Sequence, residues 1–258
     1  MGSYEFLNLE VSSKVAVITL NRPPVNALNI GLYRDIKDAF DEVSSRKEDV
    51  NVAILTGAGR AFCGGRDLKV AGSEDPEERA KWVKAGLGAP YHCGVPVIAA
   101  VNGAAVGAGC VLSMVCDIVI ASAAAFWAMP EIDAGANPSV ATILRGLNQF
   151  QARRMAFTGE RYKPEDLQRM GVLDTIVPAD QLMTEATRVA GILAAKNPEA
   201  LRAAKWSANE VESLFSDFEQ AYRAIESKVS AVTMQSKQAK ESVAAFAQKQ
   251  GPLSGRSY

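Results

Sequence analysis

Residues 96–122 read PVIAAVNGAAVGAGCVLSMVCDIVIAS, and this stretch decides the fold class. It begins and ends with short apolar runs, at 96–101 and 117–121, and a glycine-containing turn at 102–109 leads into an apolar helix between them. Short, continuously apolar runs separated by helices are typical of parallel strands that are covered on both faces. The stretch therefore predicts a strand-turn-helix-strand unit of an α/β protein.

The same alternation extends toward the N-terminus. Apolar runs at 14–20 and 51–56 predict two more strands, which end at the turn signals NRPP (21–24) and GAG (57–59). Between them, Asn29 is expected to cap a helix. The apolar positions of that helix recur at helical spacing and are Leu32, Ile36, Phe40 and Val43.

The chain changes character after about residue 170. Residues 181–196 carry one apolar stripe, and Pro198 is expected to begin the next helix. Residues 208–249 are rich in Ala, Ser, Glu, Gln and Lys, which predicts a helical segment that caps the core or reaches a neighbouring subunit. We expect an α/β core at 1–195 and a helical C-terminal region at 196–258.

Composition excludes several classes of function. The 258 residues include 28 Lys and Arg against 29 Asp and Glu, and this balance argues against affinity based on nucleic-acid phosphates. Four cysteines without a CxxC pair, together with the single His92, provide too few suitably spaced ligands for a zinc site. We therefore expect reduced thiols, no metal and no nucleic-acid partner.

Nothing in the sequence indicates a membrane. Residues 1–10 lack the basic and apolar pattern of a targeting segment. Residues 85–116 contain no Lys, Arg, Asp or Glu, but several glycines and prolines interrupt them, which favours buried strand and helix over a span. A cytoplasmic protein is the expectation.

Three glycine-containing turns follow expected strands, at 59–68, 102–109 and 130–135, which is where α/β folds bind ligands. The turn at 102–109 matches neither GxGxxG nor GxxxxGK[ST], so dinucleotide and P-loop sites are excluded by spacing. A helix that begins near Gly107 presents free backbone N–H groups, and small residues let a substrate oxygen approach them. This arrangement is suited to an oxyanion hole.

Together these segments resemble the crotonase (enoyl-CoA hydratase/isomerase) superfamily over essentially the whole chain. The markers are LNRPPVNALN (20–29), AFCGGRDLK (61–69), residues 96–122, MPEIDAG (129–135), TGERYKPEDLQRMGVLDTIVP (158–178) and AFAQKQGP (245–252). The resemblance implies an α/β spiral of ββα units with a helical C-terminal region that caps the core or forms trimers. It also implies a homotrimer or hexamer that binds a bent acyl-CoA as substrate, with no other cofactor.

The resemblance carries over to particular catalytic residues. The backbone N–H groups of Arg66 and Ala108 match the two donors that hold the thioester oxygen, and Glu131 matches the acid/base of the P-E motif. Family hydratases use a second glutamate, whose position is Val111 here. Because valine exchanges no proton, the pattern favours Δ3-Δ2 enoyl-CoA isomerisation by one glutamate.

Coenzyme A contacts are expected from three segments of the chain. The matching residues are Val25, Ala27, Arg66, Asp67, Leu68, Lys69, Phe246 and Lys249. The arginine at position 66 departs from the small or apolar residue common there. Its side chain has two interpretations, a guanidinium that reaches an acyl carboxylate or a CoA phosphate, and an exposed arginine at a loop edge.

Other activities of the superfamily stay open. Hydration needs another water-holding group beside Glu131, and a hydroxycinnamoyl-CoA hydratase-lyase needs a tyrosine such as Tyr162 or Tyr222. A hydrolase is also compatible, with Asp133 as either a second acid or a structural cap. Val111 disfavours a dienoyl-CoA isomerase, and the unusual segment 136–142 leaves the acyl group undefined. A non-catalytic acyl-CoA carrier is the alternative outside enzymes.

Three further side chains are expected to be structural. His92 lies at a loop end before the third strand, where a general base is not expected. Trp82 and Trp127 are expected to pack or to line a pocket wall.

Overall fold

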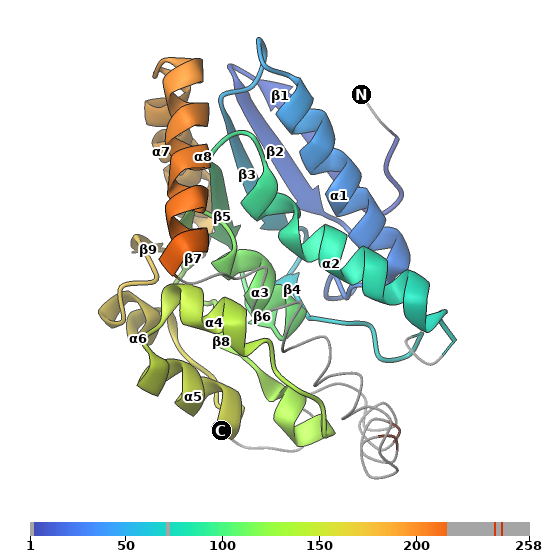
Figure 1. Ribbon diagram of the computed structural model, residues 1–258. Helices are drawn as coiled ribbons and strands as arrows, with labels where there is room; N and C mark the ends of the chain where they lie inside the picture. Colours follow the sequence, from blue (N-terminus) through green and yellow to red (C-terminus); the bar gives the residue numbers. More distant parts are fainter. Residues whose placement is uncertain (1–2, 71–72, 216–239, 241–243, 245–258) are drawn as a thin grey trace.

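The computed structural model describes residues 3–70, 73–215, 240 and 244, which form a mixed α/β fold (Figure 1). The strands are β1 (Leu7–Ser12), β2 (Val15–Leu20), β3 (Val52–Gly57), β4 (Ala61–Cys63), β5 (Val97–Val101), β6 (Ala104–Val106), β7 (Ile118–Ser122), β8 (Phe126–Ala128) and β9 (Thr175–Val177). The helices are α1 (Ile30–Ser45), α2 (Pro76–His92), α3 (Ala108–Met114), α4 (Val140–Gly146), α5 (Gln149–Thr158), α6 (Pro164–Arg169), α7 (Leu182–Ala194) and α8 (Pro198–Phe215), with 3₁₀ turns η1 (Pro130–Ala134) and η2 (Ala179–Gln181).

The strands form two sheets. Six of them are ordered β1-β2-β3-β5-β7-β9, and the other three are ordered β4-β6-β8. Apart from the antiparallel β1–β2 pair, neighbouring strands are parallel. The three turns β3-β4-α2, β5-β6-α3 and β7-β8-α4 each add one strand to the large sheet, one strand to the small sheet and then a helix. The expected α/β spiral of ββα units is confirmed.

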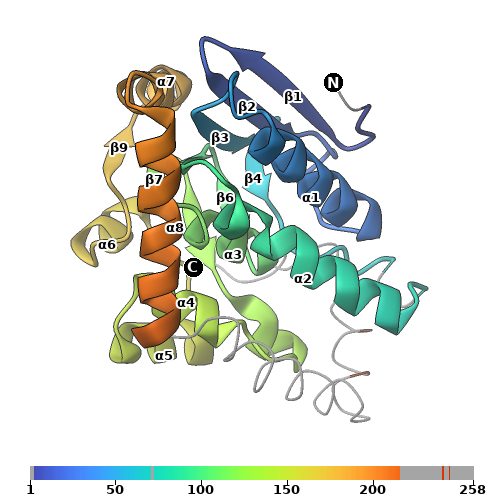
Figure 2. The same cartoon turned by 45° about the horizontal axis from the view of Figure 1, so that its top comes forward.

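Helices cover both faces of the large sheet, as the apolar runs predict (Figure 2). Alternate residues of a strand point to opposite faces, so Ala53 and Leu55 of β3 join the core under α1, whereas Ile54 faces α7. Asn29 caps α1 as expected, because its side-chain oxygen accepts a hydrogen bond from the amide of Leu32 (2.8 Å).

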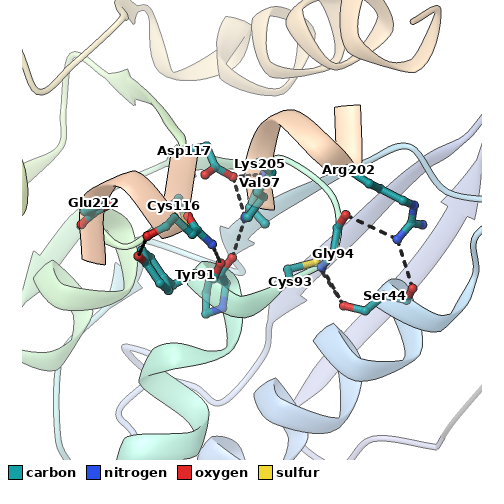
Figure 3. A network of polar contacts seen from close by, with 12 residues as sticks. Ser44, Tyr91, Cys93, Gly94, Val97, Cys116, Asp117, Arg202, Lys205 and Glu212 are labelled. Carbon is teal, nitrogen blue, oxygen red and sulfur yellow. Dashed lines mark hydrogen bonds and ion pairs between the residues drawn. The ribbon is translucent and has the colours of Figure 1, made fainter. Parts of the chain in front are cut away.

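Helix α8 lies across the amino ends of the parallel strands (Figure 3). Arg202 donates hydrogen bonds to the carbonyls of Ser44, Gly94 and Val50, which precede β5 and β3 or end α1. Pro198 begins this helix, as predicted, and its contacts cap the core of the same chain. The division of the chain at residue 195 stays a prediction.

An ion pair between a buried lysine and a more exposed aspartate supports the same junction (Figure 3). Lys205 is 6% exposed, and its ammonium group donates to the carbonyl of Pro90 (2.8 Å) and to the carboxylate of Asp117 (2.7 Å). The Asp117 carboxylate also accepts the amide N–H of Val97 (2.7 Å), at the start of β5. One lysine therefore ties α8 to α2 and to the starts of β5 and β7.

The four cysteines are buried with free thiols. Burial raises the pKa of the Cys63 thiol to about 12, so this group stays protonated at neutral pH. In the described part of the chain, no cluster of three or more His, Cys, Asp or Glu residues is arranged to hold a metal ion. None of the described helices combines the length and apolar character needed to cross a bilayer.

Candidate active site

The small sheet organises the candidate site. Its three strands run parallel, with Ala61 of β4 beside Ala104 of β6, and Ala104 beside Phe126 of β8. Soon after its carboxyl end, each strand leads into one expected catalytic residue: β4 into Arg66, β6 into Ala108 and β8 into Glu131. Carboxyl ends of parallel strands meet at one edge, so the sheet gathers residues that are far apart in the sequence.

Two backbone amides lie close together at this edge. A methyl group on Gly65 would be 2.6 Å from the carbonyl oxygen of Val106 and 3.6 Å from the nitrogen of Ala108, so only glycine permits this approach. Gly65 also has a φ of +86°, which glycine adopts without strain. The turn after β4 is therefore held against the start of α3.

Both of these amides are available to a ligand. Arg66 pairs with Leu28 in an isolated parallel bridge, in which Leu28 donates to Gly65 (2.8 Å) and Asp67 donates to Leu28 (2.8 Å). That pattern leaves the N–H of Arg66 unused. Ala108 opens α3, and no acceptor for its N–H lies among the described residues. A substrate oxygen between the two loops can accept from both.

The Glu131 carboxylate lies against the same turn. A methyl group on Gly107 would be 2.5 Å from Oε1 of Glu131, so the glycine makes room for the carboxylate. One turn further into α3, Val111 is 3% exposed and belongs to the apolar core. The start of α3 is therefore bordered by a carboxylate from η1, whereas its own first turn contributes a buried apolar side chain.

Asp133 faces a different neighbour. Its side chain is exposed, and a methyl group on Gly159, at the end of α5, would be 3.2 Å from its carboxylate. The 3₁₀ turn η1 thus directs Glu131 toward α3 and Asp133 toward α5. This geometry favours the structural interpretation of Asp133 over that of a second acid.

Tyr162 does not lie beside Glu131 either. It is buried and pairs with Trp127 through reciprocal backbone hydrogen bonds (2.8 and 3.0 Å). Burial raises the pKa of its phenol, and the charged groups that act on it are Arg154, Glu160 and Asp166. Its hydroxyl therefore lies with α5 and α6 and gives no support to a hydratase-lyase. Tyr222 lies outside the described residues.

The structure brings two of the expected CoA-binding segments together. The carbonyl of Val25 accepts the amide of Gly64 (2.8 Å), and the carbonyl of Ala27 accepts a guanidinium hydrogen bond from Arg22 (2.8 Å). Arg22 also forms an ion pair with Asp67 (2.7 Å). The turn at 25–27 and the segment 66–69, which includes Leu68 and the exposed Lys69, are therefore adjacent. Phe246 and Lys249 lie outside the described residues.

Asn26 fixes the turn at 25–27 to β4 and to the loop before it, a role that was not predicted from the sequence. It is 1% exposed, and its side-chain amide donates to the carbonyls of Ala58, Ala61 and Phe62. Its φ of +54° lies in the left-handed region that asparagine tolerates better than most residues. An asparagine inside the tight NRPPVNALN turn was the available signal.

The sequence left two interpretations of the Arg66 side chain, and the structure does not support the one in which it is an exposed arginine at a loop edge. Its Nε atom is buried. Burial lowers the pKa of the guanidinium, and nearby Arg79 lowers it further, while Tyr33, Glu74 and Glu131 act in the opposite direction. The guanidinium therefore lies close enough to Glu131 for the two charges to interact.

The remaining singled-out side chains are structural. Trp127 is fully buried, and its indole N–H donates to the hydroxyl of Ser113 (2.9 Å), so its packing role is confirmed. The Arg34 guanidinium lies 4.9 Å from the ring centre of Trp82. His92 is exposed at the end of α2, with its ring edge-on to Tyr91.

Comparison with known proteins gives consistent matches. The family model described as enoyl-CoA hydratase/isomerase matches residues 10–254. A probable enoyl-CoA hydratase of Mycobacterium bovis is 33% identical over 261 residues, which cover 97% of this chain and 98% of that protein. The 2,3-dehydroadipyl-CoA hydratase of Escherichia coli is 30% identical over 93% of this chain and 94% of its own length. A crystal structure of an enoyl-CoA hydratase from Mycobacterium avium subsp. paratuberculosis superposes with a TM-score of 0.86 at 25% identity, covering 97% of this chain and 99% of that one.

Proposed function

The chain belongs to the enoyl-CoA hydratase/isomerase family, and from this premise we propose that it moves the double bond of an enoyl-CoA with Glu131 as its acid/base. The proposal rests on one observation: Glu131 is the acidic residue at the site, and an apolar residue stands where family hydratases have their second glutamate. The Glu131 carboxylate borders Gly107, whereas the position of a second glutamate is the buried Val111. One carboxylate suffices to take a proton from one carbon and return it to another.

The proposed reaction begins with a 3-enoyl-CoA whose thioester oxygen accepts the N–H groups of Arg66 and Ala108. Glu131 removes a proton from the α carbon, and the negative charge moves onto the thioester oxygen as a dienolate. The two amides stabilise that charge, each contributing about 2.7–4 kcal/mol. Glu131 then returns the proton to the γ carbon, which gives the 2-enoyl-CoA.

Hydration is the second candidate, and the names of the relatives favour it. The Mycobacterium bovis and Escherichia coli proteins are both named as hydratases. Addition of water requires Glu131 to activate the water together with a group other than Val111. The coenzyme A moiety would bind in either case along Val25, Ala27 and Asp67–Lys69, with Phe246 and Lys249 as further proposed contacts.

Mass spectrometry in D₂O separates the two reactions. Purified protein is incubated with 3-enoyl-, 2-enoyl- and hydroxycinnamoyl-CoA esters. Deuterium in a double-bond-shifted product that has gained no water supports isomerisation. A 2-enoyl-CoA that gains one heavy water contradicts the isomerase proposal and establishes hydration. Binding of the esters without any turnover points to the carrier.

Glu131→Gln tests the proposed base. We expect the rate to fall by about 10²–10⁴-fold with CoA-ester affinity retained, because the amide keeps the shape but exchanges no proton. Asp133→Asn, two residues away on η1, is expected to keep most of the rate. Equal losses in the two variants would make Asp133 a participant in the chemistry.

We also propose a homotrimer or hexamer. Helix α5 exposes two large aromatic side chains, Phe150 at 86% and Phe157 at 64%, which is costly in water unless another subunit covers them. Light scattering after size exclusion tests this assembly. A monomer at micromolar concentration contradicts it.

A further inference from the structure

Arg66 and Asp67 direct their side chains to opposite sides of the loop after β4. The segment pairs with Leu28 as an extended bridge, and successive side chains of extended backbone alternate in direction. Asp67 reaches Arg22, on the side of the turn at 25–27 that is expected to hold coenzyme A. Arg66 is consequently directed away from that side.

The neighbours of the Arg66 guanidinium agree with this direction. Its charge interacts with those of Glu131, Glu74 and Arg79 and with Tyr33 of α1. Glu131 is the proposed base, and the Glu74 carboxylate already accepts the amide N–H of Ile30 (3.0 Å) at the start of α1. Both carboxylates near Arg66 therefore have other tasks.

No hydrogen bond or ion pair joins the Arg66 side chain to another described residue. Its Nε atom is buried without a hydrogen bond, and no carboxylate there lies within ion-pair distance of its guanidinium. Burying part of a guanidinium without a hydrogen-bond partner costs free energy, which an anionic ligand that fits the fork-shaped donor group would offset. A planar carboxylate matches this donor geometry with two hydrogen bonds.

We propose that the substrate is an acyl-CoA whose acyl group carries a second, free carboxylate, and that this carboxylate pairs with the Arg66 side chain. The inference rests on the proposed function of the Glu131 site, because it assigns the acyl end of the same substrate. Arg66 thus has two separate tasks, since its backbone N–H serves the thioester oxygen and its side chain selects the acyl group.

The test compares pairs of enoyl-CoA esters of equal chain length, one ending in a methyl group and the other in a carboxylate, over several lengths. We expect the wild-type protein to favour the best carboxylate ester by at least about 30-fold in kcat/KM. Arg66→Met should lower kcat/KM for the carboxylate ester at least about ten-fold more than for the methyl ester, because the methyl ester loses no ion pair. Arg66→Lys should restore part of the preference, and Arg154→Met, at an exposed arginine of α5, should change neither rate.

Two outcomes would overturn the inference. The first is a wild-type protein that handles the methyl and carboxylate esters equally at every length, a result that needs no variant to fold. The second is Arg66→Met weakening both esters and free coenzyme A alike, which would assign the side chain to a CoA phosphate. Calorimetric binding of saturated esters, which undergo no double-bond chemistry, separates this inference from the proposed function. A carboxylate preference in binding supports Arg66 even if turnover is absent.

Discussion

Two cations at opposite ends of the parallel strands, the buried Lys205 and the half-buried Arg66, differ in how their charge is satisfied. Lys205, at the amino ends, has a carbonyl and a carboxylate within 2.8 Å. Arg66, beyond the carboxyl ends, has a buried Nε atom without a hydrogen bond among the described residues. A paired buried charge fixes one arrangement of the chain, whereas an unpaired one is retained at a cost that a ligand can offset. The difference separates a structural junction from the site that we propose for a substrate carboxylate.

The largest effect is expected at the structural junction. Lys205→Met should lower the free energy of unfolding by about 2–4 kcal/mol, because it removes the hydrogen bonds of a buried ammonium group to the Pro90 carbonyl and the Asp117 carboxylate. Urea denaturation measures this change. Lys196→Met, at an exposed lysine just before α8, should stay within about 0.5 kcal/mol of wild type. Equal stability of the two variants would contradict the structural role of Lys205.

A smaller loss is expected from the other half of the pair. Asp117→Asn should destabilise by about 1–3 kcal/mol, since the amide oxygen can still accept from Lys205 or from Val97 but carries no charge. Combining it with Lys205→Met in a double-mutant cycle should give a loss smaller than the sum of the two single losses. Strict additivity would show that the two side chains do not stabilise each other.

The smallest effect is expected at Arg66. Arg66→Met should leave the free energy of unfolding unchanged or raise it by up to about 1 kcal/mol, because an apolar side chain replaces a half-buried guanidinium whose Nε atom has no hydrogen bond. Thermal and urea unfolding without ligand provide the measurement. A loss of stability comparable to that of Lys205→Met would show that Arg66 has a structural partner and that the two cations do not differ in this respect.

Four of the six strands of the large sheet were predictable, and the small sheet was not. The strands β3, β5 and β7 come from apolar runs of five or six residues, which are long enough to recognise in the sequence. The strands β4, β6 and β8 have three residues each, and Ala104–Val106 looks like part of a turn that leads into a helix. Such short strands have no recognisable sequence pattern, and only their pairing with neighbouring strands in the folded protein identifies them.

The candidate site divides in the same way. The motif resemblance identified Arg66, Ala108 and Glu131 as candidates, and the fold brings all three to one edge of the small sheet. It left the direction of the Arg66 side chain open, because that direction depends on the bridge to Leu28, 38 positions earlier. The ion pair between Lys205 and Asp117 joins residues 88 positions apart and leaves no local signal at all.

The contacts of α8 also bear on the order in which the protein folds. Arg202 bonds to Ser44 across 158 positions of the chain, and Lys205 bonds to Asp117 across 88. Contacts of such large sequence separation raise the contact order and slow folding, since the connecting chain must be ordered first. During synthesis, the amino ends of β3, β5 and β7 stay uncovered until α8, the last described helix, has been made. We therefore expect these strand ends to be the part of the nascent protein that depends most on protection by chaperones.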